Sequence, residues 1–277
     1  MSTAHMWRKA LSGGLNATKS GYSLQGILNH QEVVSVRSKI VQEMRKQKIS
    51  ALNMQGGATT MMEVPQHPAP WHLTGKGYIL LYKIKKSFIE NHGMVPPFLQ
   101  GKFSGGFGCL MLVDYATSDA GPYGELLFIP GKFHHEGEKL NTISKIYVST
   151  IDSVVNGRRN WGIPKEQAEF VFDQIDEHHE HIVVTIGTET IAEFSIRSGG
   201  LSFPVNTRLM PFPLVQKHEG KYFYTTFTGR GKGRLAHIEK ISINDKLFPD
   251  VSACKLLAAI KVEPFDIEFP KPEIGNS

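Results

Sequence analysis

The hydrophobic and polar positions of residues 70–277 alternate in short runs of the kind that form β-strands. Val, Ile, Leu, Phe and Tyr are concentrated in these runs, and polar or glycine-containing turns separate them. The runs lie at 77–84, 108–115, 125–130, 145–151, 169–175, 182–186, 191–196, 222–227, 235–238 and 265–269. This spacing is typical of antiparallel sheets that close into a barrel or a sandwich. We therefore predict a mainly β (α+β) fold.

Helical patterns are few. Residues 31–48 place Val33, Ile40 and Met44 near one face, with Arg, Lys and Gln on the other, which predicts an amphipathic helix. Shorter helices are predicted over residues 86–92 and 252–260. Residues 54–69 contain a glycine pair and two prolines and are typical of a linker. The sequence thus predicts an N-terminal extension over residues 1–69, loose apart from one helix, and a folded domain over residues 70–277.

Composition narrows the class of protein. Hydrophobic residues make up 40% of the chain and charged residues 21%, which is ordinary for a globular protein. The net charge of +5 is spread along the chain, which argues against nucleic-acid binding. Cys109 and Cys254 are far apart, which argues against a disulfide framework or a zinc site and favours a reducing compartment. No apolar run approaches the ~20 residues that span a bilayer, so we expect no membrane partner.

These features favour a cytoplasmic location. The alternative is an organelle, because the first acidic residue is Glu32 and the stretch before it carries Arg, Lys, Ser and Thr. That composition is typical of transit peptides. The interpretation that we favour for this stretch is a disordered tail.

Two polar clusters suggest chemistry at first sight. Residues 177–181, Glu-His-His-Glu-His, could ligate a transition metal, but they lie between two predicted strands and are interpreted as a solvated turn. Residues 229–233, Gly-Arg-Gly-Lys-Gly, match neither a Walker loop nor a dinucleotide-binding loop, because predicted strands flank them. We interpret them as a tight hairpin that uses glycine at positive φ. No metal and no cofactor are expected.

Lys165 lies in a sequence context that is unusual for a charged residue. It follows Trp161-Gly-Ile-Pro, a stretch that we expect to be buried. Apolar surroundings lower the pKa of a lysine from its ordinary value of about 10.4, and a neutral amine can attack a ketone to form an iminium. The alternative is a lysine that passes apolar neighbours on its way to solvent. The local sequence leaves both possibilities open.

Four segments together resemble the acetoacetate decarboxylase family. The run from Asn156 to Ala168, Asn-Gly-Arg-Arg-Asn-Trp-Gly-Ile-Pro-Lys-Glu-Gln-Ala, is similar to the motif around that family's Schiff-base lysine. Weaker likenesses occur, in the family's order, at residues 70–82, 121–130 and 265–273. The resemblance covers about residues 70–273. It implies an antiparallel β-barrel-like body, assembly into homo-oligomers and a small oxo-acid or polyketide-like substrate.

The resemblance also implies roles for individual residues. Lys165 falls on the imine-forming lysine, which in that family is activated by desolvation or by a neighbouring cation. Glu125 falls on the glutamate that positions or protonates the intermediate. We expect Trp161, Tyr123 and Phe107 to line an apolar pocket, and the nearby cations Arg158 and Lys76 to contact the substrate. The function implied is decarboxylation of a β-keto acid through a lysine Schiff base.

The sequence departs from the family's pattern at several positions. Glu166 occupies the place of a second lysine, Leu110 that of a second glutamate, and Gly75 that of an arginine, with Lys76 as the nearest cation. Two alternatives therefore stand beside decarboxylation. One keeps the lysine for aldol, dehydration or cyclisation chemistry on an oxo compound. The other is a binding module that has lost catalysis, in which Glu125 is a solvated glutamate at the start of a strand.

Overall fold

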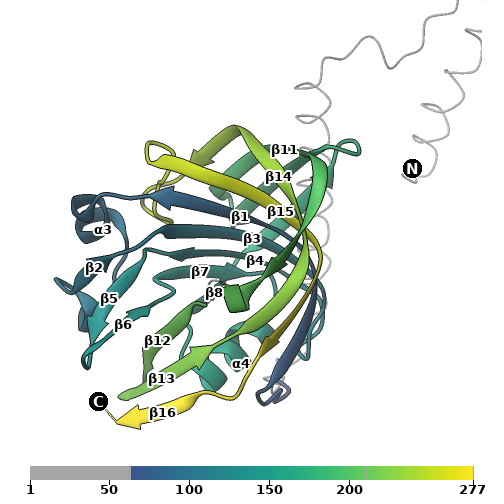
Figure 1. Cartoon of the computed structure of the whole chain (residues 1–277). Coiled ribbons are helices and arrows are strands. Elements are labelled where there is room, and N and C mark those ends of the chain that lie inside the picture. Colours follow the sequence, from purple (N-terminus) through teal and green to yellow (C-terminus); the bar gives the residue numbers. More distant parts are fainter. Residues whose placement is uncertain (1–63, 210, 277) are drawn as a thin grey trace, which may run out of the picture. The chain divides into compact units, whose positions relative to one another are not determined.

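The structure is a computed structural model that describes residues 64–209 and 211–276. The helix predicted over residues 31–48 lies outside these residues. The structure confirms that the described part of the chain is mainly β, with strands that curve into a barrel-like body (Figure 1). No helix among the described residues is long and apolar enough to cross a membrane.

Within the described residues, ten strands form one large sheet in the spatial order β8-β7-β4-β3-β1-β15-β14-β11-β10-β9. All neighbouring pairs are antiparallel except β7 and β8, which are parallel. In chain order the strands are β1 (Trp71–Lys83), β3 (Gly108–Thr117), β4 (Tyr123–Ile129), β7 (Lys145–Val148), β8 (Lys165–Gln167), β9 (Glu169–Gln174), β10 (His179–Ile186), β11 (Glu189–Asn206), β14 (Thr228–Ile243) and β15 (Lys255–Phe269).

A second sheet of six strands has the order β16-β13-β12-β6-β5-β2 among the described residues. Its strands are β2 (Phe103–Gly105), β5 (Lys132–His135), β6 (Glu138–Asn141), β12 (Pro213–His218), β13 (Lys221–Thr226) and β16 (Glu273–Asn276). The helices are α3 (Lys86–His92) and α4 (Ile151–Trp161), with short 3₁₀ turns η2 (Pro97–Leu99) and η3 (Thr207–Leu209). Helix α3 confirms the prediction over residues 86–92.

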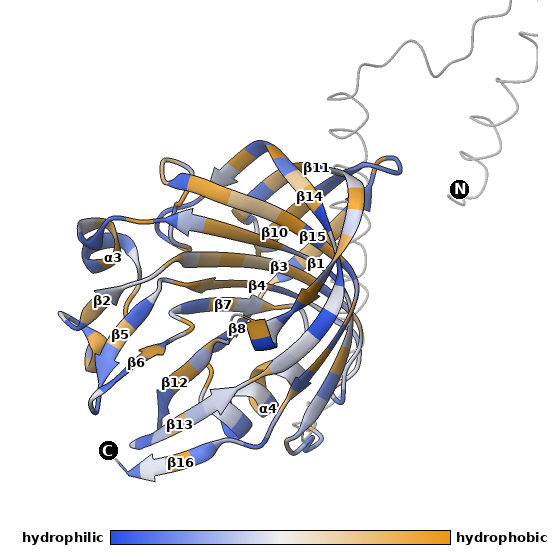
Figure 2. Ribbon diagram, in the orientation of Figure 1, coloured by the Kyte–Doolittle hydropathy of each residue, from blue (hydrophilic) through white to orange (hydrophobic). Residues whose placement is uncertain are grey.

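Strand β4 of the large sheet is buried on both faces, and alternation along it decides which side chain joins which core. On β4, Leu126 and Phe128 pack into one core, whereas Tyr123 and Leu127 pack into the other. Glu125 therefore lies on the same face as Tyr123 and Leu127, because successive side chains of a strand point to opposite faces. Figure 2 shows that hydrophobic residues follow the central strands of this sheet, while β13 and β16 are mostly hydrophilic.

The sequence predictions for residues 252–260 and 229–233 are wrong. Residues 252–260 are predicted to be helical, but from Lys255 onward they form β15, which pairs with β1 and β14. The Leu-Leu-Ala-Ala stretch has high helix propensity, and pairing on both sides outweighs it. Residues 229–233 are part of β14 rather than a hairpin turn. Their glycines allow close packing, since a Cβ on Gly233 would lie 2.7 Å from the Phe203 ring.

Candidate active site

Lys165 begins β8, a three-residue strand at one end of the large sheet. Helix α4 ends just before it at Gly162, which has φ 65° and closes the helix with an N–H bond to the Arg158 carbonyl, 2.9 Å long. Such a left-handed position favours glycine. The Arg158 side chain then donates from Nε to the Lys165 carbonyl oxygen at 2.9 Å. Helix, turn and arginine together fix the backbone that carries the lysine.

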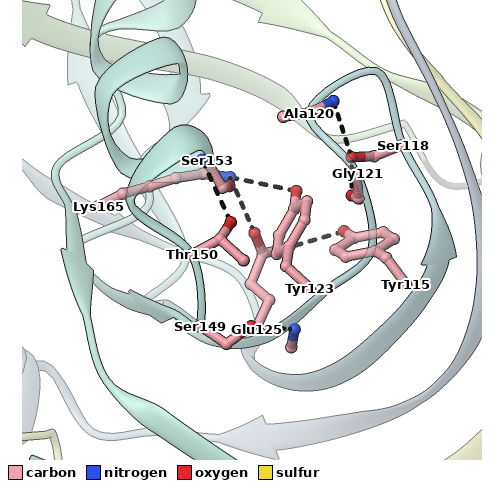
Figure 3. Close-up of polar contacts among 11 residues, drawn as sticks. Tyr115, Ser118, Ala120, Gly121, Tyr123, Glu125, Ser149, Thr150, Ser153 and Lys165 are labelled. Carbon is pink, nitrogen blue, oxygen red and sulfur yellow. Dashed lines mark hydrogen bonds and ion pairs between the residues drawn. The ribbon is translucent and has the colours of Figure 1, made fainter. Parts of the chain in front are cut away.

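The Lys165 side chain turns inward and is only 4% exposed as a residue. Its Nζ lies 3.1 Å from Glu125 Oε2, 2.9 Å from Ser153 Oγ and 3.3 Å from the Tyr123 hydroxyl, as Figure 3 shows. The same nitrogen lies 4.8 Å from the centre of the Tyr123 ring and 5.8 Å from that of Trp71. The lysine is thus held by three polar groups and enclosed by aromatic rings, rather than extended to solvent.

Glu125 is equally buried and has a second partner, because the Tyr115 hydroxyl donates to its Oε1 at 3.1 Å. Burial, followed by the charge of Glu125, raises the pKa of both Tyr115 and Tyr123 well above the ordinary value. Both phenols therefore remain protonated at neutral pH. The glutamate faces neutral hydroxyl groups and one amine, and it can accept or return a proton.

Helix α4 supplies Ser153 and a close-packed surface for the lysine stem. The helix begins after Thr150, whose side chain accepts a hydrogen bond from the Ser153 N–H at 3.4 Å. One turn later, Gly157 faces the stem of Lys165, and a Cβ at this position would lie 2.6 Å from its Cδ. Only a residue without a side chain fits there with the lysine in its present place.

A cavity of about 170 Å³ opens beside the lysine. Lys165 and Glu125 lie in its wall, together with Trp71, Tyr123 and Trp161. Most of the remaining wall is aliphatic or aromatic. The arrangement brings one amine and one carboxylate to the edge of an apolar space that has the size of a small ligand.

The structure brings together four of the residues that sequence analysis selected. Lys165, Glu125, Tyr123 and Trp161 all line the cavity. Glu166, which occupies the place of a second lysine next to Lys165, points to the other face of β8 and pairs with Lys145 at 2.6 Å. Its charge is therefore directed away from Lys165.

The other three selected residues do not line the cavity. Arg158 bonds the backbone of β8, as described above. Phe107 is 55% exposed and follows Gly105 and Gly106, whose positive φ angles form the turn before β3. Lys76 lies at a register shift of β1 between Gly75 and Gly77, and it pairs with Glu180 instead.

The histidine-rich stretch is only partly a solvated turn. Glu180 belongs to β10 and is 1% exposed; it accepts from Lys76 Nζ at 2.5 Å and from the Tyr78 hydroxyl at 2.8 Å. Lys261 Nζ lies 3.9 Å away from the same carboxylate. His181 is also buried and pairs with Glu193 at 3.1 Å. In the described part of the chain, no group of three or more His, Cys, Asp or Glu side chains is placed to hold a metal ion.

Ser153, Tyr115 and Trp71 are not among the site residues predicted from the sequence. The predicted strand extends to residue 151, whereas β7 ends at Val148 and α4 begins at Ile151. The signal for this helix was present, because Thr150 is a good N-cap residue and Asp152 follows in the first turn. Tyr115 could have been found from hairpin pairing, since it lies opposite Tyr123.

Comparisons with known proteins agree with this architecture. The family profile described as "Acetoacetate decarboxylase (ADC)" matches residues 59–215. A comparison with curated proteins finds no match. Among solved structures, the acetoacetate decarboxylase of Legionella pneumophila subsp. pneumophila str. Philadelphia 1 is similar, with a TM-score of 0.60 and 12% identity over 81% of this chain and 94% of that one.

Two further solved structures, of enzymes that are not described as acetoacetate decarboxylases, have the same fold. The enduracididine biosynthesis enzyme MppR, solved with the condensation product of pyruvate and imidazole 4-carboxaldehyde, has a TM-score of 0.56 and 13% identity over 78% of this chain and 92% of that one. An acetoacetate decarboxylase-like enzyme from Sphingomonas wittichii RW1 has a TM-score of 0.55 and 12% identity over 80% and 100%.

The fold and the site define a class of barrel-like β-proteins in which a buried lysine and a glutamate meet at an apolar cavity. The profile match spans more than half of the chain. The chain belongs to the acetoacetate decarboxylase family.

Proposed function

We propose that the protein is a lyase that decarboxylates a β-keto acid through a Schiff base on Lys165. The observation that carries this proposal is the position of Lys165 Nζ, buried at the wall of an apolar cavity and within 3.3 Å of Glu125, Ser153 and Tyr123. A lysine with only a structural role has no need of a cavity beside its nitrogen.

In the first step the Lys165 ammonium passes one proton to Glu125, whose Oε2 lies 3.1 Å from the nitrogen, and the resulting amine attacks the ketone carbon of the substrate. The former ketone oxygen takes one proton from the attacking nitrogen and one back from Glu125. Its loss as water leaves an iminium. Tyr123 and Ser153 are positioned to donate to that oxygen while it departs, since both hydroxyls lie beside the reacting nitrogen.

In the second step the bond between the α-carbon and the carboxylate breaks. Its electron pair forms a carbon–carbon double bond and neutralises the iminium nitrogen, and CO₂ leaves. The apolar wall favours this step, because the separated charges of iminium and carboxylate disappear as the bond breaks. Glu125, which takes up a proton from solvent, passes it to the enamine to give the product iminium, and water then releases the ketone and free Lys165.

Borohydride reduction tests the Schiff base directly. Incubation with a β-keto acid and borohydride is expected to add the mass of the reduced ketone to the peptide that contains Lys165. Lys165→Met should give no adduct. Lys145→Met is the matched control, because Lys145 is also paired with a glutamate but does not line the cavity. A wild-type protein that gives no adduct with any carbonyl compound would refute the proposal.

A second function is favoured by the scarcity of cations at the site. Among the described residues that line the cavity, only Lys165 and Arg230 are basic, and Arg230 is largely exposed. An oxo compound without a carboxylate next to its ketone would fit equally well, and aldol, dehydration or cyclisation chemistry would follow from the same imine. Release of CO₂ from a β-keto acid that is incubated with the protein separates the two functions, because only decarboxylation produces it.

A further inference from the structure

Five aromatic rings form a continuous row along the cavity wall. Trp71 and Trp161 are 5.0 Å apart between ring centres, and Trp161 and Phe269 are also 5.0 Å apart. Phe269 stacks on Phe227 at 5.4 Å, and Phe227 stacks on Phe212 at 6.4 Å. All five line the cavity. We call this row the aromatic wall; it begins at Trp71, 5.8 Å from Lys165 Nζ.

The polar atoms of the aromatic wall are already bonded outside the cavity. The indole N–H of Trp71 donates to the His67 carbonyl at 2.9 Å, and that of Trp161 donates to the Pro270 carbonyl at 2.7 Å. The other three rings are phenylalanines and carry no polar atom. A ligand that lies along the wall therefore meets the carbon atoms of these rings. The lining also contains Asn206 and Thr207, but the Thr207 hydroxyl is already bonded to the backbone of Gly229.

Few charged residues line the cavity. The charged residues in the described lining are Lys165, Glu125 and Arg230. Arg230 has a side chain that is 79% exposed and pairs with Asp266 at 3.3 Å, so it is a solvent-facing group. A carboxylate at the far end of a substrate would lose its hydration against phenylalanine without gaining a buried cation. Such a group is disfavoured, because an unpaired buried charge is costly.

The size of the cavity indicates how large the apolar group of the substrate must be to cover the aromatic wall. An apolar cavity of about 150 Å³ is enough to hold a benzene ring. The present cavity, of about 170 Å³, is slightly larger. A methyl group attached to the ketone would leave most of the aromatic wall uncovered, whereas a phenyl ring or a chain of five or six carbons would cover it.

We infer that the substrate of Lys165 is a carbonyl compound with an uncharged apolar group of about benzene size, which lies along the aromatic wall. This inference rests on the proposed Schiff-base function. For a decarboxylation, the substrate would be a β-keto acid whose acyl part is aromatic or medium-chain, and its only charge would be the carboxylate that is lost.

Borohydride trapping of Lys165 with a set of ketones tests the inference. The probes are acetone, 2-octanone, 4-phenylbutan-2-one and 6-oxoheptanoate, the last being close to 2-octanone in length but charged at its far end. Half-maximal labelling is expected at a concentration at least about tenfold lower for 4-phenylbutan-2-one than for acetone. The same difference is expected between 2-octanone and 6-oxoheptanoate. Equal labelling by all four would overturn the inference and leave the Schiff base standing, whereas no labelling by any would overturn both.

A truncation of the aromatic wall provides a second test. Phe227→Ala removes a ring from the row and should raise the half-maximal concentration of 4-phenylbutan-2-one about tenfold, with that of acetone changed less than about twofold. Phe172→Ala is the matched control, because Phe172 stacks on Phe170 in the other core and does not line the cavity. Should Phe227→Ala fold poorly, Phe212→Ala at the end of the row replaces it. An unchanged preference in the folded variant would contradict the inference.

Discussion

Among the described residues of the large sheet, two buried glutamates pair with lysines, and their surroundings differ. In the pair Lys165–Glu125, both side chains are 5% exposed and the nitrogen faces a cavity. In the pair Lys76–Glu180, the carboxylate has no exposure and also receives the Tyr78 hydroxyl, while the lysine is 23% exposed and does not line the cavity. A buried ion pair therefore does not identify an active site by itself. The cavity beside the amine makes the difference.

The surroundings of Glu180 are those of a structural group. Besides Lys76, it has Lys261 at 3.9 Å, and its charge adds to burial in raising the pKa of Tyr78. A carboxylate shared by two amines and a phenol is occupied on all sides. Glu125, in contrast, has one amine and one phenol hydrogen bond, and it stands beside space that a substrate can enter.

The largest expected difference lies between the two lysines. Lys165→Met should lower kcat by about 10⁴-fold or more, because it removes the nucleophile itself. Lys76→Met should leave the kcat of the folded protein within about threefold of wild type. CO₂ release from a β-keto acid measures both. A Lys165→Met variant with substantial turnover would show that the cavity does not distinguish the pairs.

Glu125→Gln is expected to be the next most severe change. It keeps the shape of the side chain but removes the proton acceptor beside Lys165, and loss of general acid–base catalysis costs about 10²–10⁴-fold in rate. Single-turnover labelling with borohydride should slow together with kcat. A variant that retains full kcat would assign Glu125 to structure alone, like Glu180.

Glu180→Gln should lower the stability of the protein and leave its kcat unchanged. It removes the carboxylate that pairs with Lys76, whereas Lys261 keeps Glu263 at 2.9 Å. Breaking a buried pair costs about 3–5 kcal/mol, and because Lys76 is partly exposed, we expect a loss of about 3 kcal/mol in the free energy of unfolding. Urea titration measures the loss. The kcat of the folded fraction should be unchanged, and a fall in kcat without a fall in stability would contradict this assignment.

Gly157→Ala tests how closely the lysine stem is positioned. The new Cβ would lie 2.6 Å from Cδ and 2.9 Å from Cε of Lys165, so the amine must move. We expect kcat to fall about tenfold and the unfolding free energy to fall by about 1–3 kcal/mol, the usual cost of overpacking. Arg159→Ala, an exposed change on the same helix, is the control. The labelling rate of Lys165 distinguishes displacement of the amine from a loss of stability alone.

The smallest effect is expected for Glu166→Gln. Glu166 pairs with Lys145 near the surface, and such pairs contribute less than about 1 kcal/mol. Burial by itself would lower the pKa of Lys145, but hydrogen bonding with Glu166 and Tyr147 outweighs it, and the pKa is raised. The contribution of the pair is therefore present below the ordinary pKa of lysine and is lost as the pH rises through the raised value. Thermal melts of both proteins at neutral and strongly alkaline pH would show a difference only at neutral pH.

Much of the architecture could be predicted because strand periodicity is a local property. The runs of residues 108–115 and 125–130 coincide with β3 and β4 to within a few residues. The errors occur where long-range pairing decides: the stretch from Lys255 has the composition of a helix but lies between two strands. Glycines 229, 231 and 233 look like part of a turn, yet they serve close packing within a strand.

The site was predictable in part for the same reason. Lys165 and Trp161 belong to one local motif, and Glu125 was found by resemblance to the family. Tyr115 and Trp71 lie on strands that are far from Lys165 in the sequence. Their place beside the lysine therefore depends on how β1, β3 and β4 pair. Lys76 was selected because it is the nearest cation in sequence, but the register shift around it and the buried charge of Glu180 place it elsewhere.

The strand that carries Lys165 is also the last strand of its sheet. An unpaired strand edge is a template on which foreign chains can add and aggregate. Here the Lys165 carbonyl is already bonded by Arg158 of α4, so that backbone position cannot accept an added strand. The guanidinium that holds the Lys165 backbone thus also occupies a carbonyl at this end of the sheet, and an added strand would have to displace it.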